Sequence, residues 1–375
     1  MTVGSNNITT SNITFKGTED LGGGLKGGFL YEIDPGVAQN TTLNAATTSN
    51  GQVYTGASAV NSEAYVNLSG AFGDIKAGTP NSPALIAGVT IQPFGTALGG
   101  GFSSGFGRLG TAGASGINQY VGAPSSGGRI IRHEKAAVYT TPTFSGFNAQ
   151  IEYSGKNANS GTYTSNDNGV LGLTANYSNG PLNAVFNSTK ASAGAVQAAG
   201  TFATLGTAAA NVLAANASTK WTIAGANYTM GAATLYAGYT TTKTDGLDGL
   251  LAATAKEDSK SWNLAGKYVI GQFDLLANYL ERKSNLTVDQ AYPHATTSGA
   301  AAASAVAAGD YTPTQKLLGL GVNYNLSKLT SVYARYEQIS GLNVSSAATL
   351  NGVAAVAAAG GATQKTTAVG IKVAF

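Results

Sequence analysis

Two glycine-containing motifs have the residue types and spacing that could do chemistry. Gly101–Gly105 (Gly-Phe-Ser-Ser-Gly) matches a nucleophile-elbow pattern, and Gly105–Gly110 (Gly-Phe-Gly-Arg-Leu-Gly) matches a dinucleotide-binding fingerprint. Each pattern works only between a strand and a following helix. Here Gly, Ser, Ala and Thr follow without helical periodicity, and a catalytic triad would have to borrow His133 or His294. We interpret both motifs as chance matches in a glycine-rich chain, and expect no catalytic residues and no enzyme.

Metal, cofactor and nucleic-acid chemistry also find little support in the residues. The chain has no Cys, and its two His residues are far apart with no ligand spacing. The net charge is only +3, and no Lys/Arg cluster or aromatic-basic interleaving is present. The sequence therefore predicts no metal site, no cofactor and no nucleic-acid partner.

The composition is unlike that of an ordinary soluble enzyme. Only 10% of the 375 residues are charged, against roughly 25% in typical globular domains. The mean hydropathy is +0.02, and no run approaches the ~18 apolar residues of a membrane-spanning helix. A membrane β-barrel fits this mixture, because alternate residues of its strands face lipid and water.

Apolar residues at every second position predict strands. At the end of the chain, Val369, Ile371 and Val373 share one face, and Gly370 and Lys372 share the other. We expect fifteen strands of this kind, at about 11–18, 24–33, 61–70, 73–79, 130–140, 146–154, 168–178, 181–190, 219–230, 232–243, 259–269, 272–283, 314–326, 328–338 and 364–375.

The lengths of the loops distinguish a membrane barrel from a soluble β-sandwich. The alternation of apolar and polar residues does not, because a sandwich would show it too. Tight turns such as 178–180, 230–231 and 270–272 alternate with long connections, which are roughly 34–60, 80–128, 155–168, 190–218, 243–259, 284–313 and 339–363. Short turns at one end and long loops at the other are typical of transmembrane barrels.

We therefore expect an all-β fold, a transmembrane antiparallel β-barrel formed by one domain over residues 1–375. A closed bacterial barrel has an even number of strands, so sixteen are expected although fifteen are visible. Either residues 1–8 supply part of the first strand or that strand is absent from this numbering. No secretory signal is visible, which favours a mature or trimmed form.

Several segments resemble a known family. Residues 11–26, 64–73, 139–147 and 326–333 are similar, in order and spacing, to strands and turns of trimeric Gram-negative general porins of the Neisseria, Burkholderia and Comamonas type. The resemblance covers nearly the whole chain. It implies sixteen strands, a homotrimer, and a third loop (80–128) that folds inward as a constriction. It also implies that terminal Phe375 is an assembly signal.

Alternation within the strands predicts which charged residues line the pore. We expect Lys16, Lys26, Arg132, Arg282, Arg335 and Lys372 to point inward, together with Glu32, Glu134, Glu152, Asp274 and Glu337. Residues 80–128 contain no Asp or Glu and carry Arg108, with Arg129 just beyond. Basic groups at a constriction favour anions. Because Asn12 and Val138 stand where the family carries Arg, we expect only a weak to moderate anion preference.

The resulting hypothesis is a passive channel for ions and small hydrophilic solutes in the bacterial outer membrane. Its expected partners are outer-membrane lipid, lipopolysaccharide and two further copies of the chain. Two alternatives stay open: a substrate-selective pore for organic acids or sugars, and an adhesin or array-forming barrel that acts through its Ala-rich loops around 191–215, 296–309 and 345–361.

Overall fold

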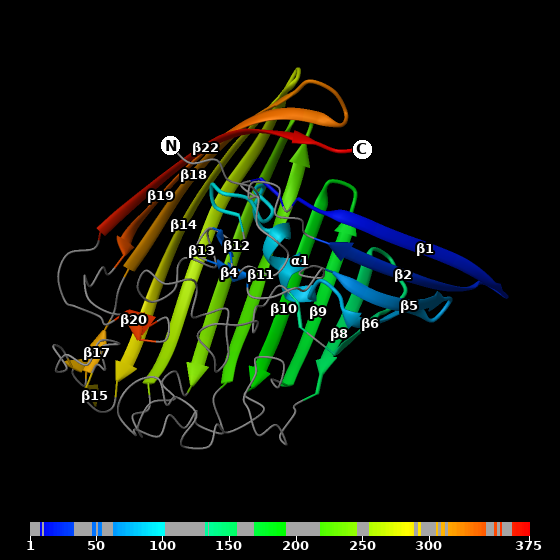
Figure 1. Ribbon diagram of the computed structural model, residues 1–375, viewed down its shortest axis with the longest axis horizontal. Coiled ribbons are helices and arrows are strands. Elements are labelled where there is room, and N and C mark those ends of the chain that lie inside the picture. The colour runs from blue at the N-terminus through cyan, green and yellow to red at the C-terminus, as the bar shows by residue number, and fades with distance from the viewer. Residues whose placement is uncertain are drawn as a thin grey trace.

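The computed structural model describes residues 8–9, 11–33, 47–49, 52–54, 63–101, 132–133, 135–155, 169–192, 218–245, 255–288, 292–293, 305–306, 309–311, 314–342, 349–350, 353–354 and 362–375. Most of them belong to one antiparallel sheet, in which each strand pairs with the next along the chain (Figure 1). Its strands are, in order, β1 (Ile13–Gly22), β2 (Leu25–Ile33), β5 (Ala64–Gly70), β6 (Gly73–Thr79), β7 (Ala136–Thr140), β8 (Phe147–Ser154), β9 (Gly169–Asn179), β10 (Leu182–Ser192), β11 (Ser218–Met230), β12 (Ala233–Asp245), β13 (Ala255–Ile270), β14 (Phe273–Val288), β18 (Thr314–Asn325), β19 (Thr330–Leu342) and β22 (Ala362–Val373).

These fifteen strands confirm the fifteen expected from the alternation of apolar residues. The largest difference in bounds is at β7, which was expected to begin near residue 130 and begins at Ala136. Lys135 has a φ of 54°, a left-handed conformation that ends an extended strand on its N-terminal side. Arg132 therefore lies outside β7, in an isolated bridge with Asn81.

The predicted turns are also confirmed. β9 and β10, β11 and β12, and β13 and β14 are each joined by two residues, and Gly180, Gly231 and Gly271 in these turns have φ of 56°, 57° and 58°. Glycine adopts this conformation without steric cost. Because consecutive strands are antiparallel, the short turns lie at one end of the sheet and the long connections at the other.

Some long connections contain short elements that the sequence did not indicate. β17 (Gly309–Tyr311) pairs with the last residues of β14, beyond the part of β14 that pairs with β18. Separate two-stranded sheets are formed by β3 (Thr47–Ser49) with β4 (Gln52–Tyr54), β15 (Tyr292–Pro293) with β16 (Ala305–Val306), and β20 (Thr349–Leu350) with β21 (Val353–Ala354). The connection between β6 and β7 contains a helix, α1 (Pro83–Thr90), which lies in front of β10 and β11 in Figure 1.

The two ends of the strand order are β1 and β22, which show no pairing with each other among the residues that the structure describes. The segment expected to supply a sixteenth strand, residues 1–8, lies outside the described residues except for Ile8. That strand stays a prediction. In the same described part, no helix is long and apolar enough to cross a membrane.

Candidate functional site

The face of the sheet that α1 covers, called here the inner face, carries most of the buried polar side chains. One row of directly paired residues runs across this face from β2 to β14, and in chain order it reads Lys26, Ser69, Asp74, Thr140, Gln150, Thr174, Asn187, Ile223, Thr240, Ser261 and Arg282. Cross-strand partners share a face, so the inner face is largely polar. The opposite, outer face carries exposed apolar residues such as Leu173, Leu264 and Val369.

Helix α1 begins at a strong local start signal. The Ser82 side chain caps the helix, because its Oγ accepts a hydrogen bond from the Leu85 amide at 3.0 Å. Pro83 occupies the first turn, where its missing N–H costs nothing. The helix was not among the elements predicted from the sequence, although the Ser-Pro pair followed by Ala-Leu-Ile-Ala is a recognisable signature.

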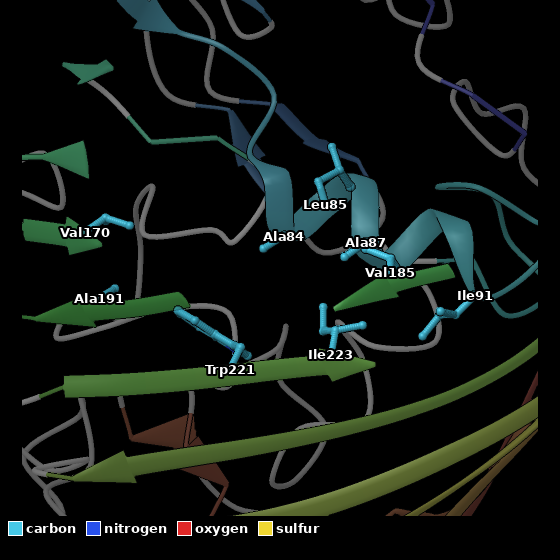
Figure 2. Close-up of a cluster of buried hydrophobic side chains, with 9 residues drawn as sticks. All are labelled: Ala84, Leu85, Ala87, Ile91, Val170, Val185, Ala191, Trp221 and Ile223. Carbon is cyan, nitrogen blue, oxygen red and sulfur yellow. The ribbon is translucent and has the colours of Figure 1, made fainter. Parts of the chain in front are cut away.

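The helix is seated on the sheet by an apolar cluster. Ala84, Leu85 and Ala87 of α1, with Ile91 just after it, pack against inward-pointing side chains of β9, β10 and β11. Figure 2 shows Ile223 of β11 directed toward the helix, and Trp221 of the same strand extending along the sheet toward Ala191 of β10. Trp221 is 3% exposed and Ile223 is 1% exposed. Burying these groups stabilises the packing of the helix on the wall, since each large apolar side chain contributes about 1.5–3 kcal/mol.

Asparagine side chains of the wall hold the last residue of the helix and the backbone that follows it. Asn227 of β11 donates to the Thr90 carbonyl at 2.9 Å, and Asn263 of β13 donates to the Ile91 carbonyl at 2.7 Å. Further along, Asn278 of β14 donates to the Gly100 carbonyl at 3.0 Å. Buried carbonyl groups need such donors. These side-chain amides therefore provide hydrogen bonds for the carbonyl groups of the segment and fix its position.

The same segment is held from β19 by a carboxylate. Glu337, which is 1% exposed, accepts hydrogen bonds from the amides of Gly99 and Gly100 at 3.2 and 3.1 Å. Hydrogen bonds to a charged acceptor are about twice as strong as neutral ones. Arg335, which is nearer the short-turn end of β19, lies over the Phe94 ring at 5.8 Å and donates to the Asn323 side chain at 2.6 Å.

Glycines of the wall give the segment the space for this close approach. A Cβ at Gly238 would lie 2.5 Å from Ile91 Cδ1, and one at Gly225 would lie 2.6 Å from Ile91 Cγ2. At Gly319 of β18 a Cβ would overlap the carbonyl oxygen of Gly99. Residues 84–101 therefore lie directly against the inner face from β9 to β19.

The connection between β6 and β7 begins near Asn81 and ends near Arg132. These two segments, called here its stems, are hydrogen-bonded to each other and to neighbouring residues of the sheet. Arg132 donates to the Asn81 side chain at 2.9 Å, and Asn81 donates through its backbone and side-chain nitrogens to the Glu63 carboxylate at 2.9 and 3.0 Å. His133 Nδ1 lies 2.7 Å from Glu152 Oε1, and these two side chains are 6% and 0% exposed. The entry and the exit of the third connection are thus fixed near the same place.

The predicted pore-lining residues fall into three groups. Lys16, Lys26 and Lys372 lie on the inner face by register and are exposed. Arg282 and Arg335 also lie on that face but are only 4% and 3% exposed.

The remaining predicted residues include Arg132, which is half-buried in the stem, and Arg108, Arg129 and Glu134, which lie outside the described residues. Both glycine motifs lie there too, except for Gly101. Phe375, the predicted assembly signal, is fully exposed at the end of the chain.

The family follows from a comparison with known proteins. A family model described as Gram-negative porin matches residues 2–344. The chain belongs to the Gram-negative porin family. The expected all-β porin architecture and the outer-membrane location are thereby confirmed.

Individual relatives support the same assignment. The chain is 34% identical over 190 residues to outer membrane porin protein 32 of Delftia acidovorans, a match that covers 48% of this chain and 45% of that relative. The chain thus matches less than half the length of this curated relative.

Solved structures show the fold. An anion-selective porin from Comamonas acidovorans has a TM-score of 0.64 at 22% identity and covers 99% of this chain, and 91% of that structure is covered. OmpT of Vibrio cholerae, in a trimer form, has a TM-score of 0.57 at 16% identity, with 96% and 89% covered. At these identities the likeness concerns the fold alone.

Proposed function

We propose that this porin is a passive diffusion channel for ions and small hydrophilic solutes, with a weak to moderate anion preference, and that it has no enzymatic activity. The observation that carries the proposal is the polar inner face partly covered by residues 84–101. A wall of paired polar side chains can hydrate a passage. A segment fixed against one side of that wall narrows the passage without closing it.

The position of that segment supports a proposal for the route of the solutes. Its contacts fall on β9 to β19, whereas the exposed lysines Lys16, Lys26 and Lys372 stand on β1, β2 and β22. We therefore expect solutes to pass along β22, β1 and β2. Arg282 and Arg335, which are buried, act on solutes through their field and not through direct contact.

The anion preference is proposed to arise at the constriction loop, residues 80–128, together with the arginines that follow it. The loop has no Asp or Glu and carries Arg108, with Arg129 and Arg132 after it. An arginine keeps its charge at any working pH. The fold relative from Comamonas acidovorans is described as anion-selective, which agrees with this proposal.

We further propose a homotrimer in contact with outer-membrane lipid and lipopolysaccharide. The trimer form of OmpT, a protein of similar fold, supports the first part. Chemical cross-linking of the purified protein in mild detergent should give a species of three chains. A sharp monomer band under conditions that preserve the folded sheet would contradict it.

The channel is tested by reversal potentials in a planar bilayer. In dilute KCl we expect a shift of anion-selective sign that fades in molar KCl, because the Debye length falls from about 10 Å at 0.1 M to roughly 3 Å at 1 M. The variant Arg108→Ser should move the preference toward cations, and Arg108→Ser/Arg132→Ser should move it further.

The single variant Arg108→Ser is the control for damage to the stem of the loop, because Arg132 also donates a hydrogen bond to Asn81 there. A wild-type potential of cation-selective sign, or a double variant identical to wild type, would show that these arginines do not set the selectivity. Absence of any ohmic current would overturn the channel itself.

A further inference from the structure

Lysines form a belt on the outer face of seven strands. Each shares its face with exposed apolar residues of the same strand, as Lys260 does with Trp262 and Leu264. The members of this lysine belt are Lys190 of β10, Lys220 of β11, Lys243 of β12, Lys260 of β13, Lys283 of β14, Lys316 of β18 and Lys365 of β22, and all seven are exposed.

The belt stands at a nearly constant distance from the short turns. Each lysine lies eight to ten residues from the short-turn end of its strand, as Lys220 does from Met230 and Lys283 from Phe273. At about 3.4 Å per residue and a strand tilt of roughly 45°, this spacing corresponds to a height of about 19–24 Å. The apolar band of an outer-membrane barrel is about 25 Å tall. The belt thus lies at the long-loop edge of the band, at the level of the external headgroups.

The lysines are placed close to one another despite their like charge. In the register, Lys220 is paired directly with both Lys190 and Lys243, and Lys260 is paired with Lys283. Like charges directly opposite each other destabilise a sheet. Three carboxylates share the outer face of these strands by register within the part that the structure describes: Asp258 is paired with Lys243, Asp245 is paired with Lys256 beyond the belt, and Glu281 lies 3.7 Å from Lys283 and 4.0 Å from Lys316. A positive excess remains, which an external anion would neutralise.

Along β1, β2 and β5 to β9 the described outer face has no such belt. At the same height β1, β2 and β9 carry Ile13, Ile33 and Leu171. In the described part of β1, β2 and β5 to β9, Glu19 is the charged outer-face residue, and it lies beside a short turn. A second copy of the chain could pack on this side, where Glu19 is the one charge described, whereas two belts would repel each other. A like subunit is therefore excluded as the partner of the belt.

We infer that the lysine belt binds the phosphate groups of a phosphorylated lipid of the outer leaflet. Lysine binds phosphate as a flexible point charge, and its long stem allows the amine to reach the headgroup while the carbons lie along the apolar band. The ring pair of Trp262 and Tyr279, with centroids 5.5 Å apart, stands just beneath the belt, where an interfacial aromatic girdle belongs. The inference rests on the proposed channel, because it requires the sheet to span the outer membrane.

The test uses the full chain in detergent and the variant Lys190→Gln/Lys220→Gln/Lys243→Gln. Binding of fluorescent bis-phosphorylated lipid A is measured by anisotropy, with dephosphorylated lipid A as the second probe. We expect wild type to bind the phosphorylated lipid, and the variant to lose at least tenfold in affinity, which is about 1.4 kcal/mol. The matched control is Lys16→Gln/Lys26→Gln/Lys372→Gln, which removes the same charge from the inner face and should bind the lipid as wild type does.

Four outcomes overturn the inference: an unchanged affinity in the belt variant, an equal loss in the inner-face control, equal binding of dephosphorylated lipid A, or full competition by millimolar inorganic phosphate. Conductance in a planar bilayer distinguishes this failure from failure of the channel. The belt variant should conduct as wild type does. If wild type conducts but any of the four binding outcomes is found, the proposed channel is retained and the inference that the lysine belt binds lipid phosphate is rejected.

Discussion

The inner and outer faces of the same strands, most clearly of β11 to β14, differ in how their side chains are stabilised. On the inner face, side chains such as Asn263 and Asn278 are buried, and each has a specific partner in residues 84–101. On the outer face, Leu264 and Leu275 are exposed, and their neighbours along the strand are interchangeable apolar groups. A buried polar side chain depends on one partner, whereas an apolar side chain facing lipid depends only on being apolar. Substitutions should therefore be costly on the inner face and mild on the outer one.

The largest expected effect is that of Gly319→Val on the inner face. A Cβ there would overlap the Gly99 carbonyl oxygen, so the segment must leave the wall and lose its bonds to Glu337 and Asn278. Overpacking of this kind costs about 1–3 kcal/mol, and the lost hydrogen bonds add to it. We expect a lower melting temperature and an altered single-channel conductance.

The matched control for this substitution is Gly266→Val on the outer face of β13. A Cβ at Gly266 would have its nearest neighbours at 3.9 Å, so the change should leave both measurements within error of wild type. Unchanged conductance in Gly319→Val together with full stability would show that the segment does not define the passage.

Asn263→Ala should have an intermediate effect. It leaves the buried Ile91 carbonyl without its donor at 2.7 Å, and an unsatisfied buried group costs about 1–3 kcal/mol. Denaturation in detergent should show this loss, and fluctuation of the single-channel current should increase as the segment loosens. Asn148→Ala is the control, since Asn148 is an inner-face asparagine whose partner is the Asn176 side chain of the wall itself. Equal effects of the two substitutions would remove the distinction between anchoring and ordinary wall asparagines.

The smallest effect on the folded pore is expected from deletion of Phe375. This side chain is fully exposed beyond β22, at the short-turn end of the sheet. We propose that the assembly machinery recognises it. Its deletion should therefore lower the amount of protein in the outer membrane, while assembled pores keep their conductance. Quantitative immunoblots of membrane fractions, paired with bilayer recordings, measure the two quantities separately. Normal yields of the deleted form would contradict the assembly role.

The sequence alone determined the strands, their faces and the separation of short turns from long connections. A period of two assigns each residue of a strand to one face, so the alternation by itself places Lys26, Arg282 and Glu337 inward. It places the strand bounds less well where a single backbone angle decides them, as at Lys135. Helix α1 was missed because eight residues of a long connection give little periodicity.

Which of the inward residues are covered depends on contacts between distant parts of the chain. Glu337 and Lys16 have the same predicted direction, yet Glu337 is buried beneath Gly99 and Gly100 and Lys16 is exposed. The difference depends on where the third connection lies, and that is decided by Ile91 facing Gly225 and Gly238, which are far away along the chain. Local alternation cannot encode such a contact. It arises from the complementary shapes of a segment and a distant wall, which meet only when the sheet has formed.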